Sequence, residues 1–302
     1  MRQSQRQNPT ARRAFLRIAE GLGWRTRAAL ARVRDVENAF KKVFWRVVGF
    51  RDSERKLMGD SQTYWNNPPD LSLQQNSHWR GAGIFVDDAR WLALGRQHLH
   101  LYEQFARAID HLRPPKRIVE WGCGGGMNAV HFAALADDFY GVDISSASLD
   151  ECAKQMNIAG LHNFSPVLID VANPEAALRQ IPASCDLAIS TYVFELLPTP
   201  EYGYRILKIV YALLAPSGIA IVQIKYSEGD WKTRSQRWSY VRNLAWNATY
   251  RIEEFWQAAE RCGFMPKMVT LVPKQPLVND RNYAYLLLQK PNTEIQTERQ
   301  CQ

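Results

Sequence analysis

The sequence predicts an α/β fold in which a doubly wound, mostly parallel sheet carries helices on both faces. Short apolar runs alternate with helical patterns through residues 115–290, an order that is typical of parallel sheets. The last two runs, 265–272 and 282–289, have only a short polar link between them, which favours antiparallel pairing of the final strand. A glycine cluster at 122–126 follows the first run, as in a nucleotide-binding strand, turn and helix.

Charge divides the chain into unlike parts. Residues 1–56 hold 15 Lys/Arg and 5 Asp/Glu, a net of +10, whereas the rest of the chain holds 23 and 25, a net of −2. A basic surface confined to one end argues against binding of nucleic acid by the whole protein. We expect a basic, partly disordered extension at 1–56, a loop and cap helix at 57–114, the α/β domain at 115–290 and a flexible tail at 291–302.

The basic extension contains a helical pattern from about Phe15 to Phe50, with apolar residues every three or four positions and Arg or Lys between them. Such a helix can pack on its own domain or a partner, or lie on an anionic membrane through residues 24–50. Nucleic-acid binding and a transit sequence are further alternatives. No apolar run reaches the ~18–20 residues that span a bilayer, and the first 30 residues lack the apolar core of a secretory signal. We therefore expect a cytoplasmic protein, with peripheral membrane contact left open.

Residues 57–82 are rich in Asn, Gln, Pro and Ser, and we expect them to form a loop. Tyr64, Trp65 and Trp79 in this stretch either anchor the loop to the core or close over a ligand. The apolar spacing of residues 86–112 predicts a helix, which the two prolines that follow it would end.

The elements of the α/β domain are predicted in order from the apolar spacing. Strands are expected at 117–119, 139–142, 166–169, 186–190, 219–225, 265–272 and 282–289. Helices are expected directly after the glycine cluster and at 147–159, 175–180, 200–214 and 252–262, with a turn at 216–218 before the fifth strand.

The cysteine pattern indicates neither a disulfide framework nor a metal site. The number of cysteines is odd and no CxxC occurs. We expect free or buried thiols in a reducing compartment and no bound metal. The five residues are Cys123, Cys152, Cys185, Cys262 and Cys301.

Acidic residues stand at the ends of three successive predicted strands. Glu120 lies at the end of the first, Asp143 at the end of the second and Asp170 at the end of the third. Ligands of open α/β sheets bind at this edge, where an acid after the second strand can accept hydrogen bonds from ribose hydroxyls. Asp170 could meet an adenine amino group. The alternative for Asp143 and Asp170 is helix capping or turn formation.

The glycine cluster also satisfies a dinucleotide fingerprint, because residues 124–129 read GxGxxA with Asp143 about 20 residues further on. Glu120 argues against that interpretation, since a carboxylate close to the glycines would repel a pyrophosphate. It would suit a cationic ligand such as the amino group of an amino-acid moiety.

The stretch EWGCGGG at 120–126 resembles the first motif of the class I S-adenosylmethionine-dependent methyltransferases. The resemblance extends over about 115–290 and includes STYVFELLP at 190–198 and LAPSG at 214–218. It implies a seven-stranded sheet whose inserted last strand is antiparallel, and S-adenosylmethionine as the cofactor. Trp121 departs from the small or aliphatic residue common in this motif.

The resemblance also implies a set of cofactor-binding residues. Glu120 and the backbone of the glycine cluster would hold the methionine part, the region of Asp143 the ribose, and Asp170 with Val171 the adenine end. The full set is Glu120, Gly122, Cys123, Gly124, Gly126, Asp143, Ile144, Asp170, Val171 and Ser190.

Two residues after the fourth strand are candidates for catalysis. Glu195 could be a general base or bind an acceptor amine, and the alternative is that it caps the following turn. Tyr192 could orient the acceptor, and the alternative is that it packs in the core. His78 and His131 are weaker candidates, and His131 falls in a predicted helix.

The function expected from these features is methyl transfer from S-adenosylmethionine to a small-molecule or lipid-linked acceptor. A dinucleotide-dependent oxidoreductase and a non-catalytic binding protein with the same fold are the alternatives. Nucleic acid is not the expected substrate, because no Asn/Asp-Pro-Pro-Tyr/Phe motif follows the fourth strand.

Overall fold

The computed structural model describes Phe44 and residues 48–67 and 71–292. The chain divides into two units, 1–50 and 51–302. Most of the predicted basic helix and the end of the predicted tail lie outside the described residues. In the described part of the chain, no helix has both the length and the apolarity needed to cross a bilayer.

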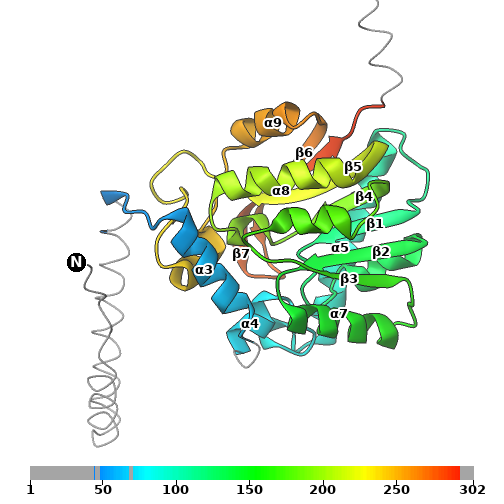
Figure 1. Cartoon of the computed structure of the whole chain (residues 1–302), viewed down its shortest axis with the longest axis horizontal. Helices are drawn as coiled ribbons and strands as arrows, with labels where there is room; N and C mark the ends of the chain where they lie inside the picture. Colours follow the sequence, from blue (N-terminus) through cyan, green and yellow to red (C-terminus); the bar gives the residue numbers. More distant parts are fainter. Residues whose placement is uncertain (1–43, 45–47, 68–70, 293–302) are drawn as a thin grey trace, which may run out of the picture. The chain divides into compact units, whose positions relative to one another are not determined.

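Seven strands of the described residues form one sheet in the order β3-β2-β1-β4-β5-β7-β6 (Figure 1). β1 to β5 pair in parallel, and β7 lies between β5 and β6 and runs antiparallel to both. This confirms the predicted seven-stranded sheet with its inserted antiparallel strand. The strands are β1 Arg117–Trp121, β2 Asp138–Asp143, β3 Phe164–Leu168, β4 Cys185–Ser190, β5 Leu214–Lys225, β6 Met265–Gln275 and β7 Asp280–Gln289.

Helices cover both faces of the sheet. The α-helices are α3 Glu54–Trp65, α4 Leu71–Asn76, α5 Asp88–Ala108, α6 Ala129–Phe132, α7 Ser146–Ile158, α8 Pro200–Leu213 and α9 Ile252–Arg261. The 3₁₀ helices are η1 Gly83–Phe85, η2 Ala133–Leu135, η3 Pro174–Arg179, η4 Phe194–Leu196 and η5 Tyr240–Trp246.

The predicted loop at 57–82 is wrong over much of its length, because α3 and α4 lie in it. Ser53 caps α3 by accepting a hydrogen bond from the Lys56 N–H. The residues that α3 buries are Leu57, Ser61, Tyr64 and Trp65. They are spaced four, three and one positions apart, so they form one helical stripe. The residues between them include Gly59, Asp60, Gln62 and Thr63, so the buried stripe is hard to recognise in the sequence.

Three smaller predictions also differ from the structure. The expected α-helix at 175–180 is the 3₁₀ helix η3, and the helix after the glycine cluster is only one turn, α6, continued by η2. The expected turn at 216–218 lies within β5, which begins at Leu214. Pairing of β5 with β4 shifts register between Cys185 and Leu187, and Ser217 adopts a positive φ of 64°. A strand can absorb a turn-like sequence in this way at an irregularity.

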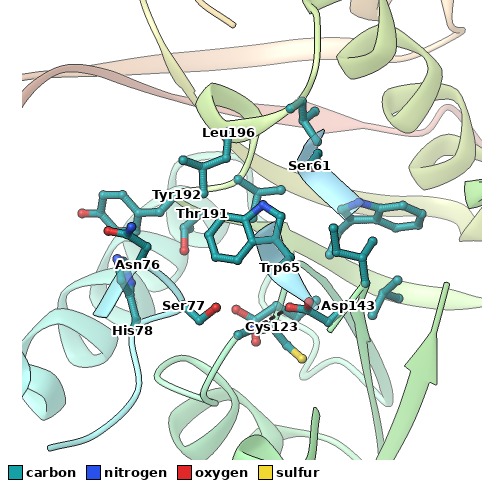
Figure 2. Close-up of a pocket in the computed structure, with 18 of the residues that line it drawn as sticks. Ser61, Trp65, Asn76, Ser77, His78, Cys123, Asp143, Thr191, Tyr192 and Leu196 are labelled. Carbon is teal, nitrogen blue, oxygen red and sulfur yellow. Dashed lines mark hydrogen bonds between the residues drawn. The ribbon is translucent and has the colours of Figure 1, made fainter. Parts of the chain in front are cut away.

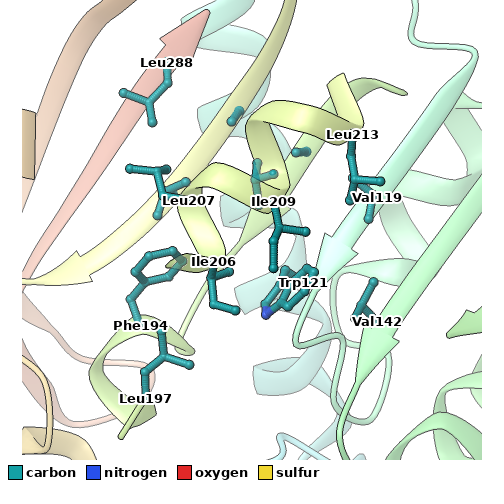
Figure 3. Packing of buried hydrophobic residues seen from close by; sticks show 14 of the residues in the cluster. Val119, Trp121, Val142, Phe194, Leu197, Ile206, Leu207, Ile209, Leu213 and Leu288 are labelled. Atoms are coloured by element: carbon teal, nitrogen blue, oxygen red, sulfur yellow. The ribbon is translucent and has the colours of Figure 1, made fainter. Parts of the chain in front are cut away.

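The apolar core occupies both faces of the sheet, and β1 contributes to each. Val119 and Trp121 pack with α8 on one face (Figure 3). Ile118 packs with α5 and α6 on the other. Side chains alternate along a strand, so Glu120 falls on the same face as Ile118, where it is 2% exposed. The strand pattern therefore buries an acidic side chain.

Candidate functional site

A pocket with an empty volume of about 840 Å³ lies at the carboxyl ends of β1, β2 and β4. This is where open α/β sheets bind ligands. Figure 2 shows Trp65 near its centre, Asp143 and Cys123 on one side and Tyr192, Asn76 and His78 on the other. From the sheet edge it is lined by Glu120, Trp121, Gly122, Cys123, Gly124, Met127, Asn128, Val142, Asp143, Ile144, Ile169, Val171, Thr191, Tyr192 and Val193. The segments above contribute Ser61, Trp65, Asn76, Ser77, His78, Leu196, Leu197, Pro198, Tyr202 and Tyr240.

The glycine loop forms one wall of the pocket and touches the segment that follows α4. Gly124 has φ +50°, and a Cβ built on it would lie 2.5 Å from the Ser77 carbonyl oxygen. The Gly125 N–H donates to the same carbonyl at 2.8 Å. Glycine at 124 therefore satisfies both the left-handed backbone and the close approach of the cap. Gly126 faces Cys152 instead and does not line the pocket.

Glu120 is a buried carboxyl on the pocket wall. Its Oε1 accepts a hydrogen bond of 2.7 Å from Asn128 Nδ2. Its Oε2 has no hydrogen-bond partner in the described part of the chain. Burial raises the pKa of this carboxyl to about 8, and the Asn128 hydrogen bond opposes that rise. A buried carboxylate needs a compensating partner, so the site favours a ligand that brings a cationic group to Oε2.

Asp143, at the end of β2, lies on the pocket wall and also organises the backbone around it. Its Oδ2 accepts from the Gly124 N–H and its Oδ1 from the Ser145 N–H, both at 2.9 Å. Each carboxylate oxygen can accept a further hydrogen bond. The turn-forming role and a role towards a ligand are therefore compatible. Burial raises the pKa of this carboxyl.

The end of β3 lies against α3. The Val171 N–H donates to Gln62 Oε1 of α3 at 2.9 Å, and Val171 lines the pocket together with Ile144. Asp170 is exposed and does not line it; its Oδ1 accepts from the Ala172 N–H at 2.6 Å. Ser190 lies behind the pocket, where its hydroxyl donates to the Trp121 carbonyl oxygen at 3.0 Å.

The two predicted catalytic residues occupy different environments. Tyr192 lines the pocket in a left-handed conformation with φ 58°, and its ring lies 4.9 Å from that of His78. Its hydroxyl points away from Trp65 in Figure 2. Glu195 does not line the pocket. It is 2% exposed, and burial raises its pKa to about 7, against the influence of Lys225.

Trp65, which was expected either to anchor the loop or to close over a ligand, lines the pocket, and two residues that the sequence did not single out, Tyr240 and Asn128, complete it. Trp65 is fixed by a hydrogen bond of 2.8 Å from its indole N–H to the Tyr240 hydroxyl, which in turn donates to the Leu196 carbonyl oxygen at 2.5 Å. Asn128 is buried although it lies in a polar-looking turn. Asn128 lies eight residues after Glu120, and no local pattern in the sequence marked the two as partners. The sequence likewise contains no signal for Tyr240, because only a tertiary contact brings this residue to the site.

Comparisons with known proteins also indicate a methyltransferase. Residues 94–266 match a family described as a methyltransferase domain. A ubiquinone biosynthesis O-methyltransferase of Paraburkholderia phymatum is 31% identical over 107 residues, 34% of this chain and 41% of that protein. The match thus spans less than half of that relative's length.

Solved structures that are similar to this chain include two methyltransferases. A methyltransferase of Methanosarcina mazei has a TM-score of 0.49 at 15% identity, with 61% of this chain and 97% of that chain covered. The N-methyltransferase NodS of Bradyrhizobium japonicum, in complex with S-adenosyl-L-homocysteine, has a TM-score of 0.49 at 12% identity, with 65% and 87% covered.

Proposed function

Since the chain belongs to the methyltransferase domain family, within the class I S-adenosylmethionine-dependent methyltransferases, we propose that it transfers a methyl group from S-adenosylmethionine to a small-molecule acceptor. One observation carries the proposal. The glycine loop and a buried carboxylate oxygen without a partner in the described residues, Glu120 Oε2, line the same pocket. Together they suit a ligand with a cationic amino-acid end.

The residues on the pocket wall fit the cofactor along its length. Glu120 would bind the amino group of the methionine part, and the glycine loop would allow its close approach. Asp143 would accept hydrogen bonds from the ribose, and Val171 would border the adenine end. When bound, the cofactor supplies a methyl group on a sulfonium with an excellent leaving group. The contribution of the protein is then mainly orientation and exclusion of water.

The dinucleotide alternative is disfavoured by the same carboxyl. In the ligand-free protein the pKa of about 8 allows Glu120 to be neutral at pH 7. A cationic amino group would favour the ionised carboxylate, because the two form a charge pair. A pyrophosphate at this position would keep Glu120 neutral and gain no charge pair from it, and no Lys or Arg among the described lining residues would offset its negative charge. Titration with NADH should therefore produce no saturable binding.

The acceptor that best fits the pocket is uncharged and largely apolar. No Lys or Arg lines the pocket among the described residues, so nothing there would pair with a phosphate or carboxylate. The end near Tyr192 offers Asn76, Ser77 and His78 as uncharged polar groups beside the apolar Leu196. The relative named for O-methylation in ubiquinone biosynthesis supports a hydroxyl acceptor, with a lipid-linked one as the narrower form of this proposal.

The test is transfer of an isotope-labelled methyl group from S-adenosylmethionine to a panel of hydroxylated aromatic compounds. We expect transfer to neutral members and much less to the same compounds carrying a carboxylate or phosphate. Asp143→Ala is the control that should abolish transfer to every member. If the folded protein binds the cofactor but methylates none of a broad panel, the non-catalytic alternative is favoured.

A further inference from the structure

We propose that His98, on α5, is a positioning residue that orients Glu120 towards the amino group of the cofactor, acting through Asn128. The inference rests on the proposed function and extends it to a residue outside the pocket wall. His98 lies 22 residues before Glu120 in the sequence, and no motif connects the two.

The three residues form a continuous chain of hydrogen bonds that ends at β7. Asn128 Nδ2 donates to Glu120 Oε1 at 2.7 Å. Asn128 Oδ1 lies 2.7 Å from His98 Nδ1. His98 Nε2 lies 3.2 Å from the Tyr285 hydroxyl. Asn128 Nδ2 also donates to the Thr191 hydroxyl at 2.9 Å, so the amide is held on three sides.

The chemistry of the chain fixes the direction of each hydrogen bond. The Asn128 NH₂ group donates to Glu120 Oε1, which turns the amide oxygen to His98; this orientation suits the ionised form of Glu120 that would pair with a cation. Burial lowers the pKa of His98 to about 4, so the imidazole is neutral and carries one N–H. That N–H must be on Nδ1, facing the Asn128 oxygen, which leaves Nε2 to accept from Tyr285.

Burial makes this arrangement specific. His98, Asn128, Glu120 and Tyr285 are each at most 4% exposed, so no member can exchange its partner for bulk water without cost. The members come from α5, the turn before α6, β1 and β7. Asn128 lines the pocket beside Glu120 and connects it to His98 and Tyr285, which do not line the pocket. With Oε1 occupied by Asn128, Oε2 is the oxygen left for a ligand.

The relay also affects the proton on Glu120. The Asn128 hydrogen bond lowers the pKa of Glu120 against the effect of burial. The other titratable groups near it are Asp143, which raises that pKa, and the thiols of Cys123 and Cys152, for which Glu120 is itself a neighbouring charge. Loss of the relay should therefore raise the pKa of Glu120, so that binding of a cationic amine requires a higher pH.

The experiment compares two ligands by isothermal titration calorimetry on the full chain. S-Adenosylhomocysteine carries the amino-acid part, and 5′-methylthioadenosine lacks it. His98→Leu removes both ring nitrogens, and His98→Asn keeps a donor near the Nδ1 position. The control His100→Leu changes an exposed histidine of α5 that neither lines the pocket nor joins the relay.

We expect His98→Leu to weaken S-adenosylhomocysteine at least about tenfold, because Asn128, no longer held by His98, would lose its hydrogen bond to the ionised Glu120. It should leave 5′-methylthioadenosine within about twofold, and move the pH of half-maximal S-adenosylhomocysteine binding upward. His98→Asn should retain most of the affinity, and His100→Leu should match the wild type with both ligands.

Equal weakening of both ligands by His98→Leu would mean that His98 only supports the fold, and unchanged affinity for both would mean that it has no role at the site. Either result overturns the inference and leaves the proposed function intact. If the wild-type chain binds neither ligand, the proposed function itself fails, and the inference fails with it.

Discussion

The buried carboxyl of Glu120 serves the proposed binding site, but it destabilises the ligand-free fold when it ionises. A carboxyl whose pKa rises from 4.5 to about 8 on folding binds more protons in the folded than in the unfolded state between those values. The free energy of unfolding therefore falls as pH rises from about 4.5 to 8. Glu120→Gln removes this loss, so we expect the ligand-free variant to be more stable than the wild type at pH 8 by more than about 1 kcal/mol.

Thermal unfolding at pH 5 and pH 8 measures this effect. The stability difference between Glu120→Gln and wild type should be larger at pH 8, while the variant binds S-adenosylhomocysteine much more weakly. Glu151→Gln, at a buried α7 position away from the pocket, is the control. Parallel stability curves for wild type and Glu120→Gln would show that Glu120 does not titrate in this window.

Asp143 and Asp170 were predicted from the same pattern, an acid after a strand, but the structure separates them. Asp143 lies on the pocket wall and pins Gly124, whereas Asp170 is exposed and closes a turn. We expect Asp143→Ala to weaken S-adenosylhomocysteine and 5′-methylthioadenosine alike, by more than about tenfold, because both contain the ribose.

Asp170→Ala is the matched variant, and calorimetry should show a change of less than about threefold, below 1 kcal/mol. A loss as large as that of Asp143→Ala would mean that Asp170 turns to the ligand on binding, as the family resemblance implies.

At the level of elements, the sequence was most informative where the determinants are local. The apolar run of β1, the acid and the glycines lie within ten residues, so the strand and turn follow from spacing and backbone freedom alone. α3 was missed because the chain around its buried stripe is polar. Trp65 reaches the pocket through Tyr240, 175 residues away, and no local pattern encodes such a contact.

The contact between the glycine loop and the cap gives an element-scale prediction. Gly124→Ala places a Cβ 2.5 Å from the Ser77 carbonyl oxygen in a left-handed backbone. We expect it to lower the free energy of unfolding by more than about 2 kcal/mol, since backbone strain and overpacking add. Chemical denaturation measures the loss, and S-adenosylhomocysteine affinity should fall with it.

Gly160→Ala separates the two contributions. Gly160 has φ +70°, and in the described structure no atom lies within 4 Å of an added Cβ. This variant should therefore show the strain alone, about 1 kcal/mol. If Gly124→Ala costs no more than Gly160→Ala, the cap does not press on the loop as the structure indicates.

For the whole molecule, the sheet order could be anticipated because alternation of strands and helices restricts the possible topologies. The side-chain network behind the pocket could not, since His98 and Tyr285 lie 187 residues apart and meet only when α5 packs on β7. Glu120 and Asn128 become hydrogen-bond partners in the buried site of the folded protein, and the composition of the sequence does not predict this pair.

Peripheral membrane contact through residues 24–50 stays a prediction of the sequence. The net charge of +10 in residues 1–56 should attract anionic lipid. Vesicles containing phosphatidylserine should co-sediment the full chain at low salt, and neutral phosphatidylcholine vesicles should not. Equal sedimentation of a chain lacking residues 1–56 would contradict it.

The central claim is that Glu120 receives the cationic amino group of S-adenosylmethionine, and proton counting tests it most directly. Calorimetric titration at pH 7, repeated in buffers of different ionisation enthalpy, measures protons released on binding. A carboxyl with a pKa of about 8 is mostly protonated in the free protein and ionises when it meets an ammonium. We therefore predict one site per chain and release of most of one proton, lost in Glu120→Gln. Binding without proton release, or no binding by the folded chain, would contradict the account.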